Sequence, residues 1–401
     1  MRRLTILFAW LLTAAAPPVQ TVTEALDQDG SIYAAHYGVS SDEAVRRLRA
    51  EQASVPVLNA IAAEFSGRLA GISVEHRPEF RFVVLLTGEQ PVADRSAAGV
   101  TVLFRTGAKA THAEAVGAMR RHLIDFRSAL PGARGAGYDQ RTGEVVLLVT
   151  GTDAARLGLD TIRQRAEQVS GVPVRVIVND LIETNAAVAG GGRVDGVNTL
   201  THRRSLCTSG FVVTDGVQTG LATAAHCPDE LSYRSPDGTA IELPFLQQWG
   251  VGYYDLQINR APDGTPALFY ADRKAGAMRP VLTWRNVAST RAGDFVCHYG
   301  ESSGYSCAEV ALTDYAPPGT LCGGPCAPAW VTVNGPDCIA GDSGGPVFSG
   351  TVAFGIAKGV NRSASGRCNF YYYMPTDYLP APWRLAVWSP APLTSRPAGR
   401  P

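Results

Sequence analysis

The spacing of apolar positions changes near the middle of the chain, and this change predicts two structurally different halves. Apolar side chains of the first half recur at helical spacing in two stretches, Val45–Phe65 and Val116–Phe126. Between and after these stretches stand strand-like runs at Phe80–Leu86, Val100–Phe104, Glu144–Val149 and Val174–Val178. In the second half, short β-like runs alternate with turn residues. The pattern therefore predicts an α+β first half and an all-β second half.

Local signals refine the first half. Ser40 with Glu43, and Thr111 with Glu114, have the spacing of capping boxes that begin helices. Pro56 interrupts the first helical stretch and predicts its division into two helices. From about residue 100 onward the order strand, helix, strand, strand, helix, strand predicts a split βαβ unit. Its further members are a strand at Gly135–Tyr138 and a helix from about Ala154 to Val169. The histidines of this half are scattered, so no catalytic cluster is indicated there.

A glycine-rich segment marks the boundary between the halves. Ala186–Gly196 lacks apolar periodicity and suits an exposed linker, where proteases cut most readily. A chain of 401 residues is also long enough for two domains. We therefore expect five segments: 1–20 as a signal peptide, 21–185 as the first domain, 186–196 as the linker, 197–388 as the second domain, and 389–401 as a Pro-rich tail.

The first residues predict export. Met1-Arg2-Arg3 is a basic head, and an apolar run from Leu4 to Leu12 and small residues at Ala14–Ala16 follow it. That run is well short of the roughly 20 apolar residues that span a bilayer. We expect a secreted, extracellular protein without a stable membrane anchor.

Composition and cysteine placement agree with this expectation. The formal net charge is zero, so bulk electrostatics gives no indication of a nucleic-acid partner. All eight cysteines lie in the second half, which is typical of a disulfide-stapled domain that folds outside the reducing cytosol. Their number alone admits 105 pairings and settles none.

Two motifs of the second half indicate nucleophilic catalysis. His226 lies in Thr-Ala-Ala-His-Cys, and histidine is the usual general base because its pKa lies near neutrality. Ser343 lies in Gly-Asp-Ser-Gly-Gly-Pro, where glycines permit a tight, exposed turn around a nucleophile. The backbone N–H groups of Gly341 and Ser343 would then stabilise an oxyanion.

An acid is needed to orient the imidazole. Asp255 is the best candidate, because it lies in the apolar, strand-like run Tyr253–Ile258 between His226 and Ser343, where a buried carboxylate requires a partner. The other aspartates between the two motifs stand in polar or turn-rich settings that favour the surface: Asp229, Asp237, Asp263, Asp272 and Asp294.

The two motifs, in this order, resemble those of chymotrypsin-like serine peptidases. The resemblance covers roughly Arg193 to Trp388. Cys207-Thr-Ser-Gly-Phe211 and Cys368-Asn-Phe-Tyr-Tyr372 make the chain most similar to the bacterial streptogrisin and alpha-lytic protease branch. In the first half, Tyr37-Gly-Val-Ser40 with Ala44–Leu48, and Ala70-Gly-Ile72 with Glu75-His76, resemble the pro region of that branch.

The resemblance implies a double β-barrel with the active site in the cleft between the barrels. It also implies that the first half is a pro region, which assists folding and inhibits the enzyme until it is cut away. By analogy it pairs Cys207 with Cys227, Cys297 with Cys307, and Cys338 with Cys368. Cys322 and Cys326 remain and could close a small local loop. A zinc site at that pair lacks further ligands at recognisable spacing, so no metal or other cofactor is expected.

The chain also departs from this family. No Ile-Val-Gly-Gly-like start follows the linker, so activation by a new N-terminus buried against Asp342 is not supported. The resemblance to the bacterial branch implies that this aspartate is instead paired internally, with an arginine. Along the expected substrate strand stand Lys358 and Gly359, which we take as substrate-binding residues. Asp337 either lines the floor of the specificity pocket or is a turn residue.

The sequence thus predicts a secreted serine endopeptidase with a Ser343–His226–Asp255 triad, made as a self-processing precursor. Its partners would be peptide or protein substrates and its own pro region. Two alternatives stay open: a pseudoprotease that only binds proteins, and an esterase that uses the same triad. Fold alone does not separate them.

Overall fold

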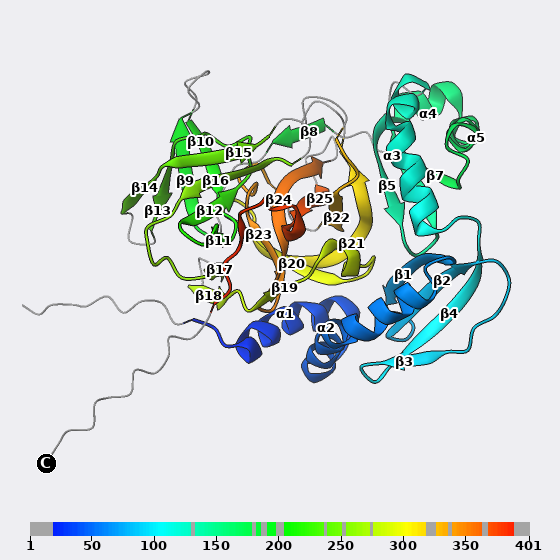
Figure 1. Ribbon diagram of the computed structural model, residues 1–401, viewed down its shortest axis with the longest axis horizontal. Coiled ribbons are helices and arrows are strands. Elements are labelled where there is room, and N and C mark those ends of the chain that lie inside the picture. The colour runs from blue at the N-terminus through cyan, green and yellow to red at the C-terminus, as the bar shows by residue number, and fades with distance from the viewer. Residues whose placement is uncertain are drawn as a thin grey trace, which may run out of the picture.

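The computed structural model describes most of the chain (Figure 1). The described residues are 19–129, 133–178, 182–185, 191–197, 204–235, 239–250, 254–272, 276–317, 326–335, 339–362 and 368–388. The predicted signal peptide and the Pro-rich tail lie outside them. Of the helices in the described part, none combines the length and apolar character needed to cross a membrane.

The first half begins with two helices and a small sheet. Helix α1 (Val22–Tyr37), which the sequence analysis did not predict, is capped by a box between Thr21 and Glu24. Ser40 caps α2 (Ser41–Glu64). The sheet has the order β1-β2-β4-β3, and its strands are β1 (Leu69–Glu75), β2 (Arg81–Thr87), β3 (Arg95–Ala97) and β4 (Val100–Ala108).

Pro56 does not divide α2, so the prediction of two helices is wrong. Proline removes one hydrogen bond and crowds the preceding turn, which disfavours a continuous helix. Here Leu48 on one side of the proline and Leu58 and Ile61 on the other are all buried. Packing on both sides of Pro56 therefore holds the helix together.

The rest of the first half is a second layer of helices on a sheet. Its helices are α3 (His112–Ala129), α4 (Gly151–Leu157) and α5 (Leu159–Ser170). Its strands are β5 (Ala133–Asp139), β6 (Glu144–Val149) and β7 (Val174–Val178), in the order β5-β6-β7. The split βαβ prediction is wrong in one respect: β4 joins β2 and β3 in the other sheet instead of joining β5–β7.

The second half is all-β, as predicted, and begins with three sheets. They have the orders β10-β9-β13-β14, β15-β16-β12-β11-β26 and β17-β18. Their strands are β9 (Arg193–Val197), β10 (Arg204–Thr208), β11 (Val212–Thr214), β12 (Thr219–Thr223), β13 (Leu231–Arg234), β14 (Ala240–Leu243), β15 (Phe245–Trp249), β16 (Leu256–Arg260), β17 (Leu268–Asp272), β18 (Ala277–Pro280) and β26 (Arg384–Leu385).

A closed barrel of six strands follows, in the order β20-β23-β24-β25-β22-β21, with β21 pairing back to β20. These strands are β20 (Phe295–Gly300), β21 (Gly304–Ala316), β22 (Trp330–Asn334), β23 (Pro346–Ser349), β24 (Val352–Arg362) and β25 (Cys368–Pro375). The short elements β19 (Thr283–Trp284), η1 (Val287–Ser289) and η2 (Thr376–Tyr378) connect to it. The fold is the predicted one: an α+β first half before chymotrypsin-like β-barrels.

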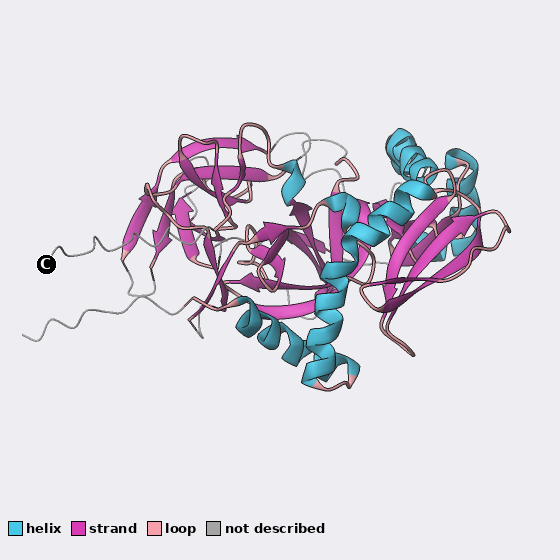
Figure 2. Ribbon diagram, turned by 60° about the horizontal axis from the view of Figure 1, so that its bottom comes forward, coloured by secondary structure: helices cyan, strands magenta, loops and turns pink. Residues whose placement is uncertain are grey.

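The two halves are joined by strand pairing and by a shared core. Strand β5 of the first half pairs antiparallel with β21, so the β5-β6-β7 sheet continues that of the closed barrel. Strand β8 (Ile182–Asn185), just before the linker, pairs antiparallel with β24. Helices α1 and α2 run along one side of the barrel (Figure 2). Leu26 and Tyr33 of α1 share one buried cluster with Phe295 and Phe348 of the second half.

Candidate active site

His226 and Asp255 form the centre of the candidate site. His226 lies in the turn after β12, and Asp255 immediately precedes β16, which pairs with β12. One carboxylate oxygen, Oδ2, lies 2.6 Å from Nδ1 of the ring, and the other accepts the backbone N–H of His226 at 2.9 Å. Asp255 is only 5% exposed, so both contacts lie in surroundings that strengthen them. The aspartate therefore fixes the orientation of the imidazole.

The two side chains shift each other's pKa in opposite directions. Burial of the ring favours the neutral imidazole, but the adjacent Asp255 carboxylate outweighs burial and raises the pKa of His226 to about 9. Burial would also raise the pKa of Asp255. The positive charges of His226 and Lys358 nevertheless hold it well below its usual range. Asp255 therefore stays ionised at neutral pH and can stabilise an imidazolium.

The turn that carries Ser343 packs directly against the strands and turn that carry His226. Ser343 accepts the backbone N–H of Thr208 through its carbonyl, and the Thr223 hydroxyl donates to the carbonyl of Thr208. A Cβ at Gly344 would lie 2.1 Å from the Thr208 carbonyl oxygen and 2.3 Å from the Thr223 hydroxyl. Glycine is therefore required after the serine for the two turns to meet.

The Ser343 hydroxyl donates to the backbone carbonyl of Lys358 at 2.6 Å. Among the described residues it makes no hydrogen bond to His226. The serine is 1% exposed and lies in the turn between β22 and β23. The structure thus brings His226 and Asp255 into contact and places Ser343 on the neighbouring turn.

Two backbone N–H groups beside Ser343 remain available for an anion. Within the described part of the chain, the N–H groups of Gly341 and Ser343 have no acceptor. Gly341 has a φ of +122°, a backbone conformation that favours glycine. Unpaired donors in a buried turn suit a developing oxyanion.

Asp342 holds this turn in place through backbone groups and not through an arginine. Its Oδ1 accepts the N–H groups of Ser302 and Ser303 at 3.2 and 3.0 Å, and its Oδ2 accepts that of Ile339 at 2.7 Å. The expectation of an arginine partner is therefore corrected, at least among the described ion pairs. The carboxylate is already satisfied within the second half, so the turn does not need a newly formed N-terminus.

The structure places Lys358 next to the aspartate of the candidate triad, a position that the sequence analysis did not predict. Lys358, in β24, was expected to bind substrate, but its ammonium lies 2.8 Å from Oδ2 of Asp255 and its side chain is 2% exposed. It also lies 4.8 Å from the centre of the Trp330 ring. A lysine inside the otherwise apolar run Val352–Val360 was the available signal, because a buried ammonium requires a partner.

The other predicted substrate-binding residues are only partly described. Gly359 lies in β24 opposite Asn185 of β8, a position where an extended chain pairs with the strand. Asp337 lies outside the described residues. Its role in a specificity pocket stays a prediction.

One of the four predicted disulfides is directly seen. Cys297 and Cys307 are bonded between β20 and β21. Cys207 and Cys227 are buried free thiols, so the disulfide predicted between them is not formed here. Burial is the main reason that the pKa of Cys207 is raised. Cys326 and Cys368 are disulfide-bonded, and their predicted partners, Cys322 and Cys338, lie outside the described residues.

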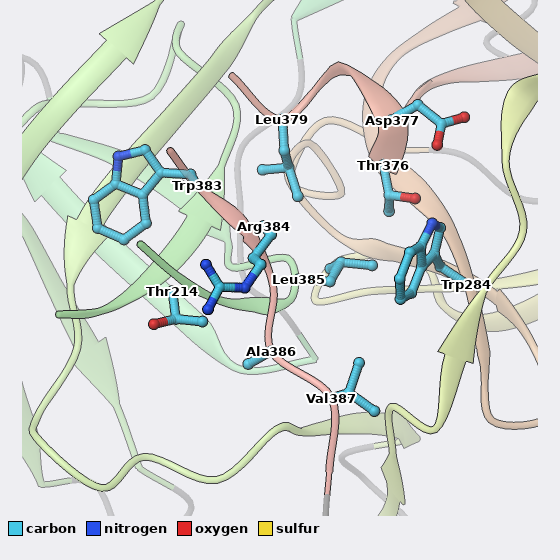
Figure 3. A pocket seen from close by; sticks show the side chains of 10 residues that line it. All are labelled: Thr214, Trp284, Thr376, Asp377, Leu379, Trp383, Arg384, Leu385, Ala386 and Val387. Atoms are coloured by element: carbon cyan, nitrogen blue, oxygen red, sulfur yellow. The ribbon is translucent and has the colours of Figure 1, made fainter. Parts of the chain in front are cut away.

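A separate groove lies along β26, away from the triad. Figure 3 shows Trp284 on one side of it, with Leu385 and Val387 near that ring and Arg384 extended toward Thr214. None of the triad residues lines this groove. It is therefore not part of the candidate active site.

No family model matches the chain, and no curated protein matches it. Solved structures similar to it are bacterial chymotrypsin-like serine proteases. Protease A of Thermobifida fusca is 23% identical, covers 50% of this chain and 100% of its own, and has a TM-score of 0.39. The Nocardiopsis protease is 20% identical, its alignment covers 50% of this chain and 100% of its own, and its TM-score is 0.37. The Cellulomonas bogoriensis chymotrypsin is 19% identical, its alignment covers 50% of this chain and 99% of its own, and its TM-score is 0.36.

Proposed function

We propose that the protein is a secreted serine endopeptidase made as a self-processing precursor. The observation that carries this proposal is the contact between His226 and the buried Asp255, beside a turn that holds Ser343 and two N–H groups without an acceptor among the described residues. A hydroxyl, a base and an orienting carboxylate are the three groups that acyl transfer to serine requires.

In the proposed first step, Ser343 Oγ attacks the carbonyl carbon of the scissile peptide bond while His226 Nε2 takes the hydroxyl proton. The oxyanion that forms accepts the N–H groups of Gly341 and Ser343. His226 returns the proton to the leaving amine, the C–N bond breaks and an acyl-enzyme remains. Water, deprotonated by the same imidazole, then attacks the ester carbonyl, releases the acid and restores Ser343. Asp255 stabilises the imidazolium in both steps.

Ser343 must turn for this reaction to begin. Its hydroxyl is bonded to the Lys358 carbonyl, so rotation about χ1 has to exchange that bond for one to His226. Rotation of a serine side chain between staggered positions needs no movement of the backbone.

Strand β8 supports self-processing. The pairing of Thr184 with Val360 and of Asn185 with Gly359 places the end of the first half on β24, next to Lys358, whose carbonyl contacts Ser343. An extended chain added to a strand beside the nucleophile is the arrangement in which a peptide substrate would lie. Arg193–Gly196 of the predicted linker instead belong to β9, which pairs with β10 and β13. The proposed cleavage would therefore fall between β8 and β9, and it would break the covalent connection between the halves.

Covalent labelling tests the proposal. The full chain, expressed with export from the cytosol, is treated with a fluorophosphonate probe, and Ser343→Ala is the matched control. We expect labelling of the parent chain and its loss in Ser343→Ala, together with loss of linker cleavage in a protease-free host. Normal linker cleavage in Ser343→Ala would contradict self-processing.

The same preparation distinguishes the alternatives. A correctly folded parent chain that is not labelled would indicate a protein-binding pseudoprotease. A labelled chain that turns over simple esters but no peptide amides would indicate an esterase. Recovery of the chain from the medium, with residues 1–20 absent, tests secretion.

A further inference from the structure

Lys358 is the one buried lysine that contacts the candidate triad among the described residues. Its ammonium and the His226 ring bind the same oxygen, Oδ2 of Asp255, at 2.8 and 2.6 Å. The other oxygen, Oδ1, accepts the backbone N–H of His226. The carboxylate thus has three donors, of which two carry or can carry a positive charge.

The position of the ammonium excludes two other roles for the lysine. As a general base in a Ser–Lys pair its amine would have to be neutral and directed at Ser343 Oγ, but its ammonium is bound to Oδ2 of Asp255 at 2.8 Å. As a recognition residue for acidic substrates it would have to be accessible, but it lies between Asp255 and the Trp330 ring and is 2% exposed. The ammonium of Lys358 would therefore influence the proposed reaction through Asp255.

We propose that Lys358 is a positioning residue of the triad, whose ammonium fixes the Asp255 carboxylate and weakens its attraction for the His226 imidazolium. This inference rests on the proposed function. A second cation bound to Oδ2 partly neutralises the carboxylate charge that would otherwise stabilise protonated His226. The base therefore stays neutral, and able to accept a proton, at lower pH than it would beside Asp255 alone.

Any other residue that lowers the pKa of His226 as Lys358 does would have to be a positively charged group near the ring. Asp255 and Lys358 come from the segments before β16 and within β24. The buried Cys227 thiol follows His226 directly, and Cys207 on β10 faces that thiol. Among these groups Lys358 is the one positive charge, and it lowers the pKa of His226 against the opposing effect of Asp255.

The test replaces Lys358 by methionine, which keeps an unbranched side chain and removes the charge. Arg384→Met is the matched control, because it removes a positive charge in the same domain from the groove away from the triad. Both changes are made in the intact Ser343→Ala chain, labelled with ¹⁵N-histidine. Of the seven histidines, His226 is assigned by His226→Gln.

In Lys358→Met we expect His226 to titrate about one pH unit higher than in the parent, and in Arg384→Met at the same pH as in the parent. The Nδ1–H proton of His226, which reports the bond to Asp255, should also change its chemical shift in Lys358→Met only. Lys358→Arg keeps the charge and should return the titration toward that of the parent. If His226 titrates at the same or a lower pH in Lys358→Met, the proposal is wrong.

A kinetic measurement provides a second readout where the chain is active. In Lys358→Met the acid limb of kcat/KM should move to higher pH by the same shift, while KM changes less than kcat. Should Lys358→Met fail to fold, Lys358→Gln replaces it in both measurements, and an unchanged His226 titration there contradicts the proposal equally. Because the NMR titration uses the inactive Ser343→Ala chain, it remains informative even if the fluorophosphonate test shows no peptidase.

Discussion

Asp29 and Arg279 form an ion pair of 2.9 Å between the two halves of the chain, and their side chains are 1% and 0% exposed. Asp29 lies in α1, and Arg279 lies in β18 of the second half. Asp29 also accepts the backbone N–H of Gly350 at 2.6 Å and the hydroxyl of Tyr305. The first half therefore supplies the carboxylate that a buried arginine of the second half requires.

Replacement of Asp29 by alanine should destabilise the intact chain by about 3–5 kcal/mol, because it leaves the Arg279 charge buried without its partner. Denaturant unfolding of the Ser343→Ala chain measures this effect. The control is Glu64→Ala, which breaks the solvent-exposed pair with Arg95 and should change the stability far less. Equal losses in the two variants would contradict the assignment of a structural role to Asp29.

The activity of the proposed mature enzyme should rise with pH through the pKa of His226. The proposed base must be neutral to accept a proton, and Asp255 raises the pKa of His226 to about 9 against the effect of burial. Below that pH, kcat/KM should fall about tenfold for each pH unit. The measurement is kcat/KM of a peptide amide from pH 5 to pH 10. If the acid limb of this profile has an apparent pKa at or below 6.5, the ordinary histidine value, the prediction is wrong.

Glu51→Gln should stabilise the intact chain at neutral pH. Glu51 lies in α2 and is 2% exposed, and its Oε2 accepts the backbone N–H of Phe295 in the second half. Burial, and next the nearby Asp294 carboxylate, raise the pKa of Glu51 well above the ordinary 4.5. The folded chain therefore keeps a proton that the unfolded chain releases, and the parent loses stability as the pH rises above about 4.5.

Thermal unfolding of the Ser343→Ala chain at pH 4 and pH 8 checks the Glu51 prediction. Glutamine cannot ionise, so Glu51→Gln should raise the midpoint at pH 8 and change it little at pH 4. An equal change at both pH values would show that the effect is one of packing and not of ionisation.

Gly300→Ala should reduce reactivity toward a fluorophosphonate roughly 100-fold. A Cβ at Gly300 would lie 2.1 Å from Oδ1 of Asp342, the oxygen that accepts the Ser302 and Ser303 N–H groups. The displaced carboxylate would move the turn that holds Gly341 and Ser343. Gly67→Ala is the control, because a Cβ there meets nothing within 4 Å. Full labelling of Gly300→Ala would show that Asp342 does not position this turn.

The sequence predicted the parts of the site that have a local pattern. Asp255 was selected because it stands in an apolar run, and it is buried together with the neighbouring Leu256 and Ile258. The serine and histidine motifs indicated two turns, and the required glycine after Ser343 is explained by the contact with the His226 turn. Short, glycine-bounded patterns of this kind predict conformation because few residues permit it.

Other features had no local pattern to reveal them. The partners of Asp342 are backbone N–H groups, which every residue except proline carries, so no residue type marks them. The place of β4 was missed because strand partners are chosen by packing over long sequence distances. The apolar run around Lys358 indicates that it needs a partner, but the identity of that partner depends on where β24 lies relative to β16, which the order of motifs does not determine.

The sheet that runs from β7 through β5 into β21 has a consequence for latency. Scission of the linker removes one covalent bond but none of the hydrogen bonds between β5 and β21, nor the buried contacts of α1. The two fragments would still elute as a single species in gel filtration. The delay between cutting and full activity would then be set by the off-rate of the N-terminal fragment, or by its digestion, and not by the speed of the cut.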